Sequence, residues 1–541
     1  MITTLNRLLA SQKIALGSLI VIWLLARAFP FSQEEPLMNP EVWNARKLLD
    51  YGFFERHGAR LTPGMWTGQL PNPQDFNYTH YPLPMLWVFT LVYKLTGPWG
   101  GPVLVLALKL AGCVIIFKIL DRQFERGAAW FASVLFAIAP CSILLDCMTD
   151  LTATSAVLWP AALWLLFRHS PAGGAAQPVA PWKAGLLVFA GGQISWFATT
   201  MVPSLMALME NWTGSLRASI RSVLKNRVAL AIMIAGVLTF LCFLAQVVLY
   251  ESDPTSLFAH IKLKMGSKQI ATTPRTTLYA LVALRVFIFT GAALLIGIAA
   301  GLPQLRRQRA PLLVAAAIYL LSFALGALGI PHHYYMDYIM QGSLLFPAAV
   351  LTAAAVQAHR RWLPWLLAVL AAGQFAYTQL IASVRTISPA STIMGKFVAE
   401  NTAATDIIVS NLKVAQSPYK NSDIHAGKAT AIVADRMMFF GFTEESQLVE
   451  LPNLLRRKEF DLVYVYDKTL PAPPKWLERI RREGRQVVAQ TLTFPPADLN
   501  FAERARAFIW YKVMRKGKQS EANPVPSNHE IEIYRLQPPP K

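Results

Sequence analysis

Three groups of polar residues interrupt a long apolar region and could do chemistry there. They are Glu34, Glu35 and Glu41; Asp146 and Asp150; and the run His332, His333, Tyr334 and Tyr335. A carboxylate can take the proton of an attacking hydroxyl or amine. Paired aspartates also offer the oxygen ligands that a hard divalent cation prefers. These residue types therefore suggest a general base, with a second acidic site beside it.

Each group also has an ordinary structural interpretation. A loop carboxylate is usually a solvated charge. Asp150 precedes an apolar segment, where a carboxylate can cap a helix and interact favourably with its dipole. Tyrosines next to an apolar segment are expected in the aromatic belt at a membrane surface. Both interpretations are kept for all three groups.

Cations that could hold a phosphate lie further along the chain. The segment 251–275 contains Lys262, Lys264, Lys268 and Arg275, and Arg285 lies about ten residues into the next apolar segment. Because a charge at that depth of a membrane is costly, Arg285 should face the protein interior and meet a phosphate or a carboxylate. Snorkelling to the surface is the alternative. Lys109 has a similar position within its own apolar segment.

Composition places the chain among polytopic α-helical membrane proteins. Its 541 residues are 54% hydrophobic and 15% charged, with a mean hydropathy of +0.37. Several apolar runs approach the roughly 20 residues that a helix needs to cross a bilayer. The net charge of +20 comes largely from short basic clusters between these runs. Such clusters mark the cytoplasmic ends of helices and favour anionic lipid over nucleic acid as a partner.

The apolar run Tyr81 to Thr96 decides which residues share a membrane face. The first run, 14–29, is read as a retained helix and not a signal peptide, which leaves the segment 32–80 outside. If Tyr81 to Thr96 crossed, the basic turn at Arg122 and Arg126 would lie outside. A juxtamembrane or re-entrant helix puts that turn inside and all the acidic groups on one outer face.

The remaining runs then give about eleven transmembrane helices, with the N-terminus inside and the C-terminus outside. The other predicted crossings are 101–120, 127–145, 151–168, two short spans within 182–211, 228–250, 276–302, 311–330, 338–357 and 362–383. Residues 1–383 form the predicted membrane domain, with external loops at 32–80 and 251–275. We expect the protein in the cytoplasmic (inner) membrane.

Residues 384–541 lose the long apolar runs and predict a small α/β domain on the outer, periplasmic or extracellular, side. Strand-like stretches occur at Asp406 to Ser410, Ala429 to Ala434, Asp461 to Tyr466 and Gln486 to Gln490, with a helix at Pro474 to Arg482. Strands that alternate with helices are typical of this class. The last twenty or so residues, rich in proline, are interpreted as a tail.

Four segments together resemble the GT-C superfamily of integral-membrane glycosyltransferases, which includes protein O-mannosyltransferases and the aminoarabinose transferase of lipid A modification. They are Glu41 to Gly52, Tyr78 to Pro84 (Tyr-Thr-His-Tyr-Pro-Leu-Pro), Pro140 to Asp150, and Pro331 to Tyr335. Each is a weak motif alone. Their order and common face extend over most of the membrane domain.

The resemblance implies an inverting glycosyltransferase that moves a sugar from a polyprenyl-phosphate donor to a lipid, glycan or protein acceptor of the cell envelope. It implies Glu41 as the base, with Glu34 and Glu35 as alternatives, because Pro40-Glu41 stands where the family usually has Asp-Glu. It implies Asp150 as a second catalytic carboxylate that, with Asp146, could bind a divalent metal ion, Mg²⁺ or Mn²⁺. The residues implied in substrate binding are Arg285, Arg275, Lys268, His80, Tyr81, His333 and Tyr335.

Two other functions fit parts of the pattern. A lipid or sugar transporter would use broken helices and charges near the membrane midplane. A catalytically degenerate GT-C-like scaffold would explain the missing Asp-Glu pair.

Overall fold

The structure is a computed structural model of the chain. The residues it describes are 1–32, 40–50, 60–61, 64–65, 77–78, 84–146, 160–166, 179–194, 203–204, 207–208, 211, 213–250, 275–307, 316–317, 319–321, 323–324, 344–382, 389–412, 430–431, 433–440, 462–470, 474–494, 501, 505 and 527–536. The chain divides into two compact units. Unit 1 is Met1–Gln33, Thr79–Met85 and Trp99–Ser383; unit 2 is Glu34–Tyr78, Leu86–Pro98 and Val384–Lys541.

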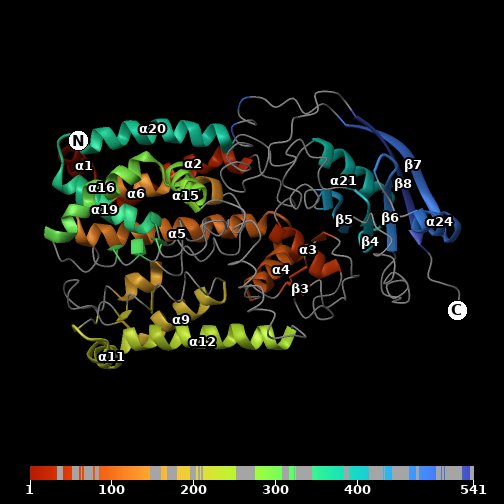
Figure 1. Cartoon of the computed structure of the whole chain (residues 1–541). Coiled ribbons are helices and arrows are strands. Elements are labelled where there is room, and N and C mark those ends of the chain that lie inside the picture. Colours follow the sequence, from red (N-terminus) through yellow and green to blue (C-terminus); the bar gives the residue numbers. More distant parts are fainter. Residues whose placement is uncertain are drawn as a thin grey trace. The chain divides into compact units, whose positions relative to one another are not determined.

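Unit 1 is a helical bundle whose long helices run along one common direction (Figure 1). Within the described part of the chain, four helices are long and apolar enough to cross a membrane: α2 (Gln12–Ser32), α5 (Gly100–Gln123), α12 (Arg227–Tyr250) and α20 (Leu363–Ala382). A fifth span is possible if the bent pair α15 (Arg275–Thr290) and α16 (Ala292–Arg307) counts as one. These helices confirm the polytopic α-helical class, while the predicted total of eleven crossings stays a prediction.

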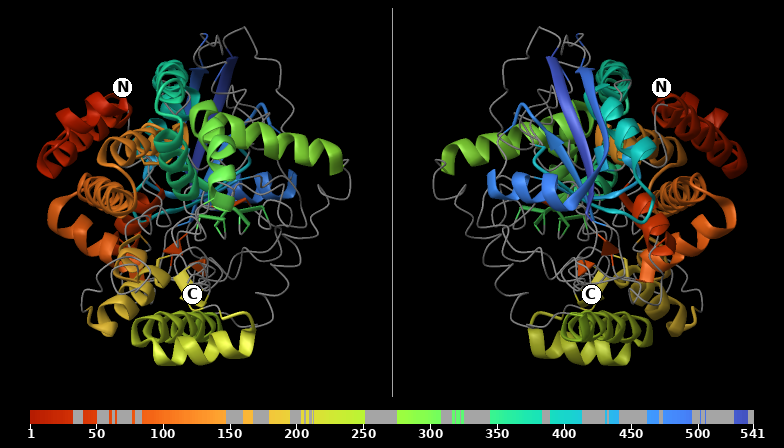
Figure 2. Two further views of the ribbon diagram at one scale, coloured as in Figure 1. Left: turned by 90° about the vertical axis from the view of Figure 1, so that its left-hand side faces the viewer. Right: turned by 90° about the vertical axis from the view of Figure 1, so that its right-hand side faces the viewer.

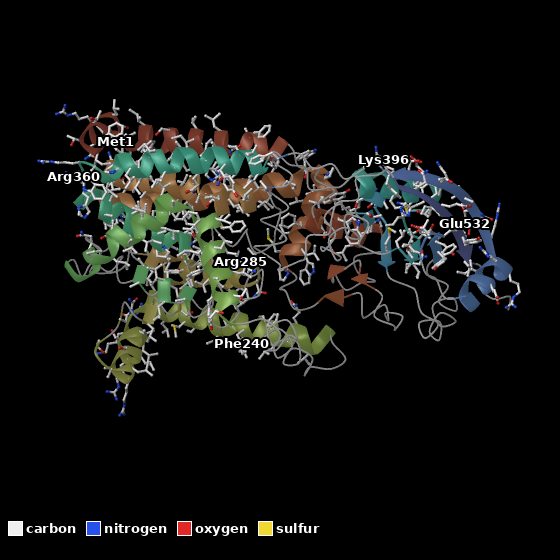
Figure 3. The ribbon with its side chains drawn as sticks, turned by 45° about the horizontal axis from the view of Figure 1, so that its top comes forward. Met1, Phe240, Arg285, Arg360, Lys396 and Glu532 are labelled. Atoms are coloured by element: carbon white, nitrogen blue, oxygen red, sulfur yellow. The ribbon has the colours of Figure 1, made fainter. Side chains whose placement is uncertain are left out.

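Polar contacts join three sequence-distant turns at one end of this bundle. From the N-terminal helix α1 (Ile2–Leu8), Asn6 donates to Glu125 at 2.9 Å, and Arg360 forms an ion pair with the same carboxylate. Gln12, the first residue of α2, donates to Asp121 near the end of α5 at 3.1 Å. Arg360 lies here near Met1 (Figure 3), and Arg126, the first residue of α6 (Arg126–Ala137), forms an ion pair with Asp121. We call this the basic end of the bundle.

At the opposite end of the bundle, an aromatic contact joins the end of α2 to the residue just before α5. Phe31 near the end of α2 packs on Trp99 just before α5, with ring centroids 5.3 Å apart. The segment 32–98 therefore leaves the bundle and re-enters it at the same end. Its helix α4 (Pro84–Thr96) has 13 residues, fewer than the roughly 20 that a crossing needs. Both facts support the prediction that Tyr81 to Thr96 does not make a single crossing.

Two predicted continuous spans are broken in the structure. The segment 127–145 forms α6 (Arg126–Ala137) and α7 (Pro140–Asp146), because Pro140 cannot continue the hydrogen-bond ladder of α6. The segment 276–302 forms α15 and α16, which bend by 102° at Gly291. Gly291 has φ +86°, a left-handed conformation that glycine adopts without steric cost.

Close backbone approach holds α16 against α19 (Phe346–Ala358). A Cβ added at Gly301 would lie 2.3 Å from the Leu351 carbonyl oxygen, and one added at Gly297 would lie 1.9 Å from Thr352 Oγ1. Small residues four apart are a recurrent means of packing membrane helices. The glycine spacing therefore explains how α19, buried from Phe346 to Val356, fits among the other helices of the bundle.

Unit 2 contains a six-stranded sheet of order β2-β5-β4-β6-β8-β7. The first four are parallel: β2 (Gly64–Met65), β5 (Met437–Phe440), β4 (Ile407–Ser410) and β6 (Leu462–Asp467). The last two are antiparallel: β8 (Ser527–Leu536) beside β6, and β7 (Gly484–Phe494) at the edge. Short strands β1 (Arg60–Leu61) and β3 (Asn77–Tyr78) form a separate pair. A small C-terminal α/β domain is thus confirmed, with one strand supplied by the early loop.

The core of the sheet lies under α21 (Pro389–Asn401). Phe397 and Val398 of this helix pack with Ile408, Val463 and Ile533 of three strands. The long strands β7 and β8 lie side by side in all views (Figures 1 and 2). The predicted strands around 407, 462 and 486, and the helix α24 (Pro474–Glu483), are confirmed.

Two predictions for this unit are wrong. The stretch Ala429 to Ala434 is not a strand: its described residues 430–431 and 433–434 are helical, and β5 begins at Met437. The proline-rich end is not simply a tail, because β8 occupies Ser527–Leu536. Ile531 and Ile533, both completely buried, provide the apolar face that this strand packs into the core.

Candidate functional site

Helix α7 contacts all three helices of unit 1 that carry a buried Lys or Arg among the described residues. It occupies the first seven residues of the predicted second acidic loop, Pro140 to Asp150, and ends at Asp146. It packs against α2, α5 and α15, and each of these helices carries one buried cation. Among the described residues of unit 1, these three are the Lys and Arg residues with less than a tenth of their surface exposed.

Arg27 of α2 is fixed by backbone carbonyls and an aromatic ring. Its guanidinium donates to the Trp23 carbonyl at 3.2 Å and to the Ala137 carbonyl, at the end of α6, at 3.0 Å. It also stacks 4.0 Å from the Trp23 ring centroid, a cation–π contact. These contacts place the break between α6 and α7 level with Arg27, in the half of the bundle that ends with Phe31 and Trp99.

Arg285 and Lys109 supply the other two buried charges. Arg285 on α15 is 1% exposed and lies well inside the bundle, away from Met1 and Arg360 (Figure 3). The prediction that Arg285 faces the protein interior is confirmed. Lys109 on α5 is also buried. A phosphate would find strong electrostatic stabilisation here, because the surroundings exclude water.

In unit 2, the helix that carries Glu41 is held by an ion-pair cluster. Helix α3 (Pro40–Asp50) begins at Pro40, whose fixed φ suits a first helical turn, so Glu41 is its second residue. Two turns later Lys47 is completely buried, with its ammonium 2.9 Å from Asp50 Oδ2 and 3.2 Å from Asp435 Oδ1. Arg46 meets the other oxygen of Asp435 at 2.6 Å. We call these four residues the α3 anchor.

The α3 anchor is constrained on the Asp435 side as well. Asp435 has φ +55° and is the one described residue other than glycine with a positive φ. Aspartate tolerates this conformation better than most residues. Burial raises the pKa of the Asp435 carboxyl above its ordinary value, and Lys47 and Arg46 oppose that shift. Strain and burial at one residue show that the surrounding structure determines its position closely.

Most of the predicted site residues lie outside the described part of the chain. These are Glu34, Glu35, His80, Tyr81, Asp150, Lys268, His333 and Tyr335. Glu41, Asp146 and Arg275 have described backbones, in α3, α7 and α15, but their side chains are not described. Within the described residues, no group of three or more His, Cys, Asp or Glu is arranged to hold a metal ion. The assigned roles of these residues remain predictions.

Sequence reasoning missed Arg27 and the α3 anchor. Arg27 lies within the first apolar segment, the same signal that identified Arg285. Nothing in the spacing of Lys47 and Asp435, 388 positions apart in sequence, could have paired them. Their partnership depends on the fold of unit 2.

Comparison with known proteins identifies the fold through structure alone. No protein-family model matches the sequence, and no curated protein matches it. The structure resembles ArnT from Cupriavidus metallidurans bound to undecaprenyl phosphate, with TM-score 0.56 and 13% identity over 88% of this chain and 95% of that one.

It also resembles an oligosaccharyltransferase from Archaeoglobus fulgidus. The apo form gives TM-score 0.51 and 13% identity over 84% of this chain and 69% of that one. A complex of that protein with Zn and sulfate gives TM-score 0.50 at the same identity, over 84% and 68%. The helical bundle with its small C-terminal sheet therefore has the fold of the GT-C membrane glycosyltransferases.

Proposed function

We propose that this protein is an inverting membrane glycosyltransferase that takes a sugar from a polyprenyl phosphate. The observation that carries the proposal is the buried Arg285, on a helix packed against α7 within a GT-C fold. A guanidinium inside a membrane bundle can stabilise a phosphate strongly, because the surroundings exclude water. A lipid phosphate is an anion of this kind, and the similar ArnT structure contains undecaprenyl phosphate.

In the proposed reaction a carboxylate takes the proton of the acceptor hydroxyl or amine. The freed electron pair attacks the anomeric carbon, the bond from that carbon to the phosphate oxygen breaks, and the configuration inverts. We propose Glu41 as this base, with Glu34 and Glu35 as alternatives, and Asp150 as a second carboxylate. Arg285 stabilises the negative charge that develops on the departing polyprenyl phosphate.

The remaining predicted residues complete the proposal. Arg275 and Lys268 add charge for the donor, and His80, Tyr81, His333 and Tyr335 contact the sugar or the phosphate. The acceptor belongs to the cell envelope, on the outer face of the cytoplasmic membrane. We propose that Asp146 and Asp150 could hold a divalent cation, and addition of EDTA to the assay tests this separately.

The direct test measures release of polyprenyl phosphate from labelled undecaprenyl-phosphate hexoses and pentoses by the full chain in nanodiscs. Removing a general base should lower the rate by about 10²- to 10⁴-fold, so Glu41→Gln should lose turnover. Glu400→Gln is the matched control, because Glu400 is an exposed glutamate on α21. Full activity in Glu41→Gln, Glu35→Gln, Glu34→Gln and Asp150→Asn alike would remove the base assignment.

Arg285 is tested by donor binding as well as by rate. Arg285→Gln should weaken retention of undecaprenyl phosphate, while Arg285→Lys should keep part of it. The control Arg361→Gln changes an exposed arginine in the α19–α20 turn and should leave retention unchanged. Equal retention by all three variants would show that Arg285 does not meet the phosphate.

The bend between α15 and α16 favours a second candidate, a transporter of lipid-linked sugar. Transporters use discontinuous helices of this kind near their substrates. Translocation of a fluorescent lipid-linked sugar across proteoliposomes, without release of polyprenyl phosphate, would support the transporter and contradict the transferase.

A further inference from the structure

The short helix α11 (Leu216–Lys225) presents an apolar stripe to the outside of unit 1. Leu216, Ile220 and Leu224 recur every four residues and are 56%, 47% and 57% exposed. Three large apolar side chains on one exposed face are unfavourable in water. This face needs an apolar environment.

A basic stripe runs beside the apolar one. Arg217, Arg221 and Lys225 follow the apolar residues by one position each, so the two stripes lie about 100° apart around the helix. All three are exposed, as is Arg227 after the helix. Within the described part of the chain none of these four cations pairs with a carboxylate, and the sequence has no Asp or Glu from 211 to 250.

The third face of α11 fixes the helix to the rest of unit 1. Ser219 and Val223 are buried, and Val223 packs in a cluster with residues of α12. The Ser215 side chain accepts from the Ala218 N–H at 3.3 Å and caps the start of α11. Asn226 accepts from the Val228 and Ala229 N–H groups at 3.1 and 3.2 Å and caps the start of α12. The turn between the two helices is therefore well defined.

The direction of α11 matches the plane of a membrane. The helix runs across the axis of the apolar span α12, as both directions of view show (Figures 1 and 2). It lies at the same end of unit 1 as α1 and the start of α20, which is the basic end. A helix joined crosswise to the end of a membrane span lies at the level of the lipid headgroups.

We propose that α11 is an interfacial helix that binds anionic phospholipid headgroups at the basic end of the bundle. Leu216, Ile220 and Leu224 enter the acyl boundary, and Arg217, Arg221 and Lys225 contact headgroup phosphates. A helix with one apolar and one basic face is suited to this position. Basic residues next to a membrane span are drawn to anionic lipid. This site is separate from the proposed donor site and does not depend on it.

The basic stripe of α11 and the direct connection of α11 to the span α12 favour lipid over other occupants. A second copy of this chain would bring the same basic stripe and repel it. An acidic protein partner would satisfy the cations, but the apolar stripe joins directly to a span that lipid already surrounds. The occupant of both stripes is therefore the membrane surface.

The first experiment measures the position of α11 in the membrane. A fluorophore on Ile220→Cys, with the native cysteines replaced, is placed in nanodiscs of the full chain. We expect quenching by lipids brominated near the headgroup and little quenching by aqueous iodide. Val487→Cys on the exposed face of β7 is the control and should show the opposite pattern. Iodide quenching at Ile220 equal to that at Val487 would overturn the proposal.

The second experiment measures lipid preference by native mass spectrometry of protein taken from mixed phosphatidylglycerol and phosphatidylcholine nanodiscs. The triple variant Arg217→Gln, Arg221→Gln, Lys225→Gln should lower the retained ratio of anionic to zwitterionic lipid by at least about tenfold. The control changes three exposed cations of unit 2, Lys396, Arg482 and Arg485, to glutamine. An unchanged ratio in the first triple variant would overturn the proposal, and so would an equal fall in both. A shift from dimer to monomer on dilution would instead identify a second copy as the occupant.

Discussion

Replacement of Lys47 by methionine should release helix α3 from the rest of unit 2. The Lys47 side chain is completely buried and the Asp435 side chain is 13% exposed, so neither charge has much access to water. Removing one partner of a buried pair costs about 3–5 kcal/mol, because the other charge stays uncompensated. Arg46 still faces Asp435 at 2.6 Å, so we expect about 3 kcal/mol.

Hydrogen exchange of α3 amides is the assay, because a chain of two units has no single free energy of unfolding. A loss of about 3 kcal/mol corresponds to exchange roughly 150-fold faster. Lys47→Arg should keep part of the protection, and Lys396→Met, at an exposed lysine of α21, should keep all of it. In the double variant Lys47→Met with Asp435→Asn, most of the lost protection should return.

The stability that Asp435 contributes should change with pH in a defined direction. Burial raises the folded-state pKa of Asp435 above its unfolded value of about 3.9. The folded state therefore binds the proton more tightly, and its stability falls as pH rises from about 4 to the raised pKa. Lys47→Met removes a cation that lowers this pKa, so the fall should extend to higher pH. Asp435→Asn should abolish it.

Two results would refute this reasoning. The first is exchange in Lys47→Met that is less than about threefold faster than in Lys396→Met. The second is protection of α3 that rises between pH 4 and 7, after correction for intrinsic exchange rates. Either would mean that water reaches the α3 anchor freely.

Three other predictions concern packing, the sheet and topology. Gly301→Leu should separate α16 from α19 and lower the melting temperature by several degrees, because its side chain would meet backbone atoms; an unchanged melting curve would contradict the packing. Arg535 donates to both oxygens of the buried Asp406, at 3.0 and 2.8 Å, so Arg535→Gln should increase exchange of β8 amides by about tenfold or more, corresponding to roughly 1.5–3 kcal/mol. Trp99→Cys and Arg361→Cys should react with an impermeant maleimide from opposite sides of the membrane; labelling from one side would contradict the proposed topology.

The apolar pattern alone was sufficient for the class of the protein and for much of its layout. Long apolar runs identify the spans α2, α5, α12 and α20, because only a helix satisfies its own backbone in lipid. The cost of a charge inside such a run similarly predicted that Arg285 is buried. The strands β4 and β6 were found because short apolar runs between turns indicate buried parallel strands.

The breaks within helices and the pairing of strands depended on tertiary structure. The bend at Gly291 and the helical residues 430–431 and 433–434 depend on packing that no local pattern contains. Strand β8 becomes a strand by pairing with β6 and β7, and β2 joins the same sheet from more than 370 positions away.

The same division applies to the site. Residue types selected the carboxylates and the cations, since proton transfer and phosphate binding require those groups. Folding determined that α3 is held by Asp435 and that three helices with a buried cation pack against α7, because ion pairs and helix contacts join residues that are distant in sequence. Sequence thus determined which chemistry the chain could perform, and tertiary structure decided which groups lie close enough to perform it.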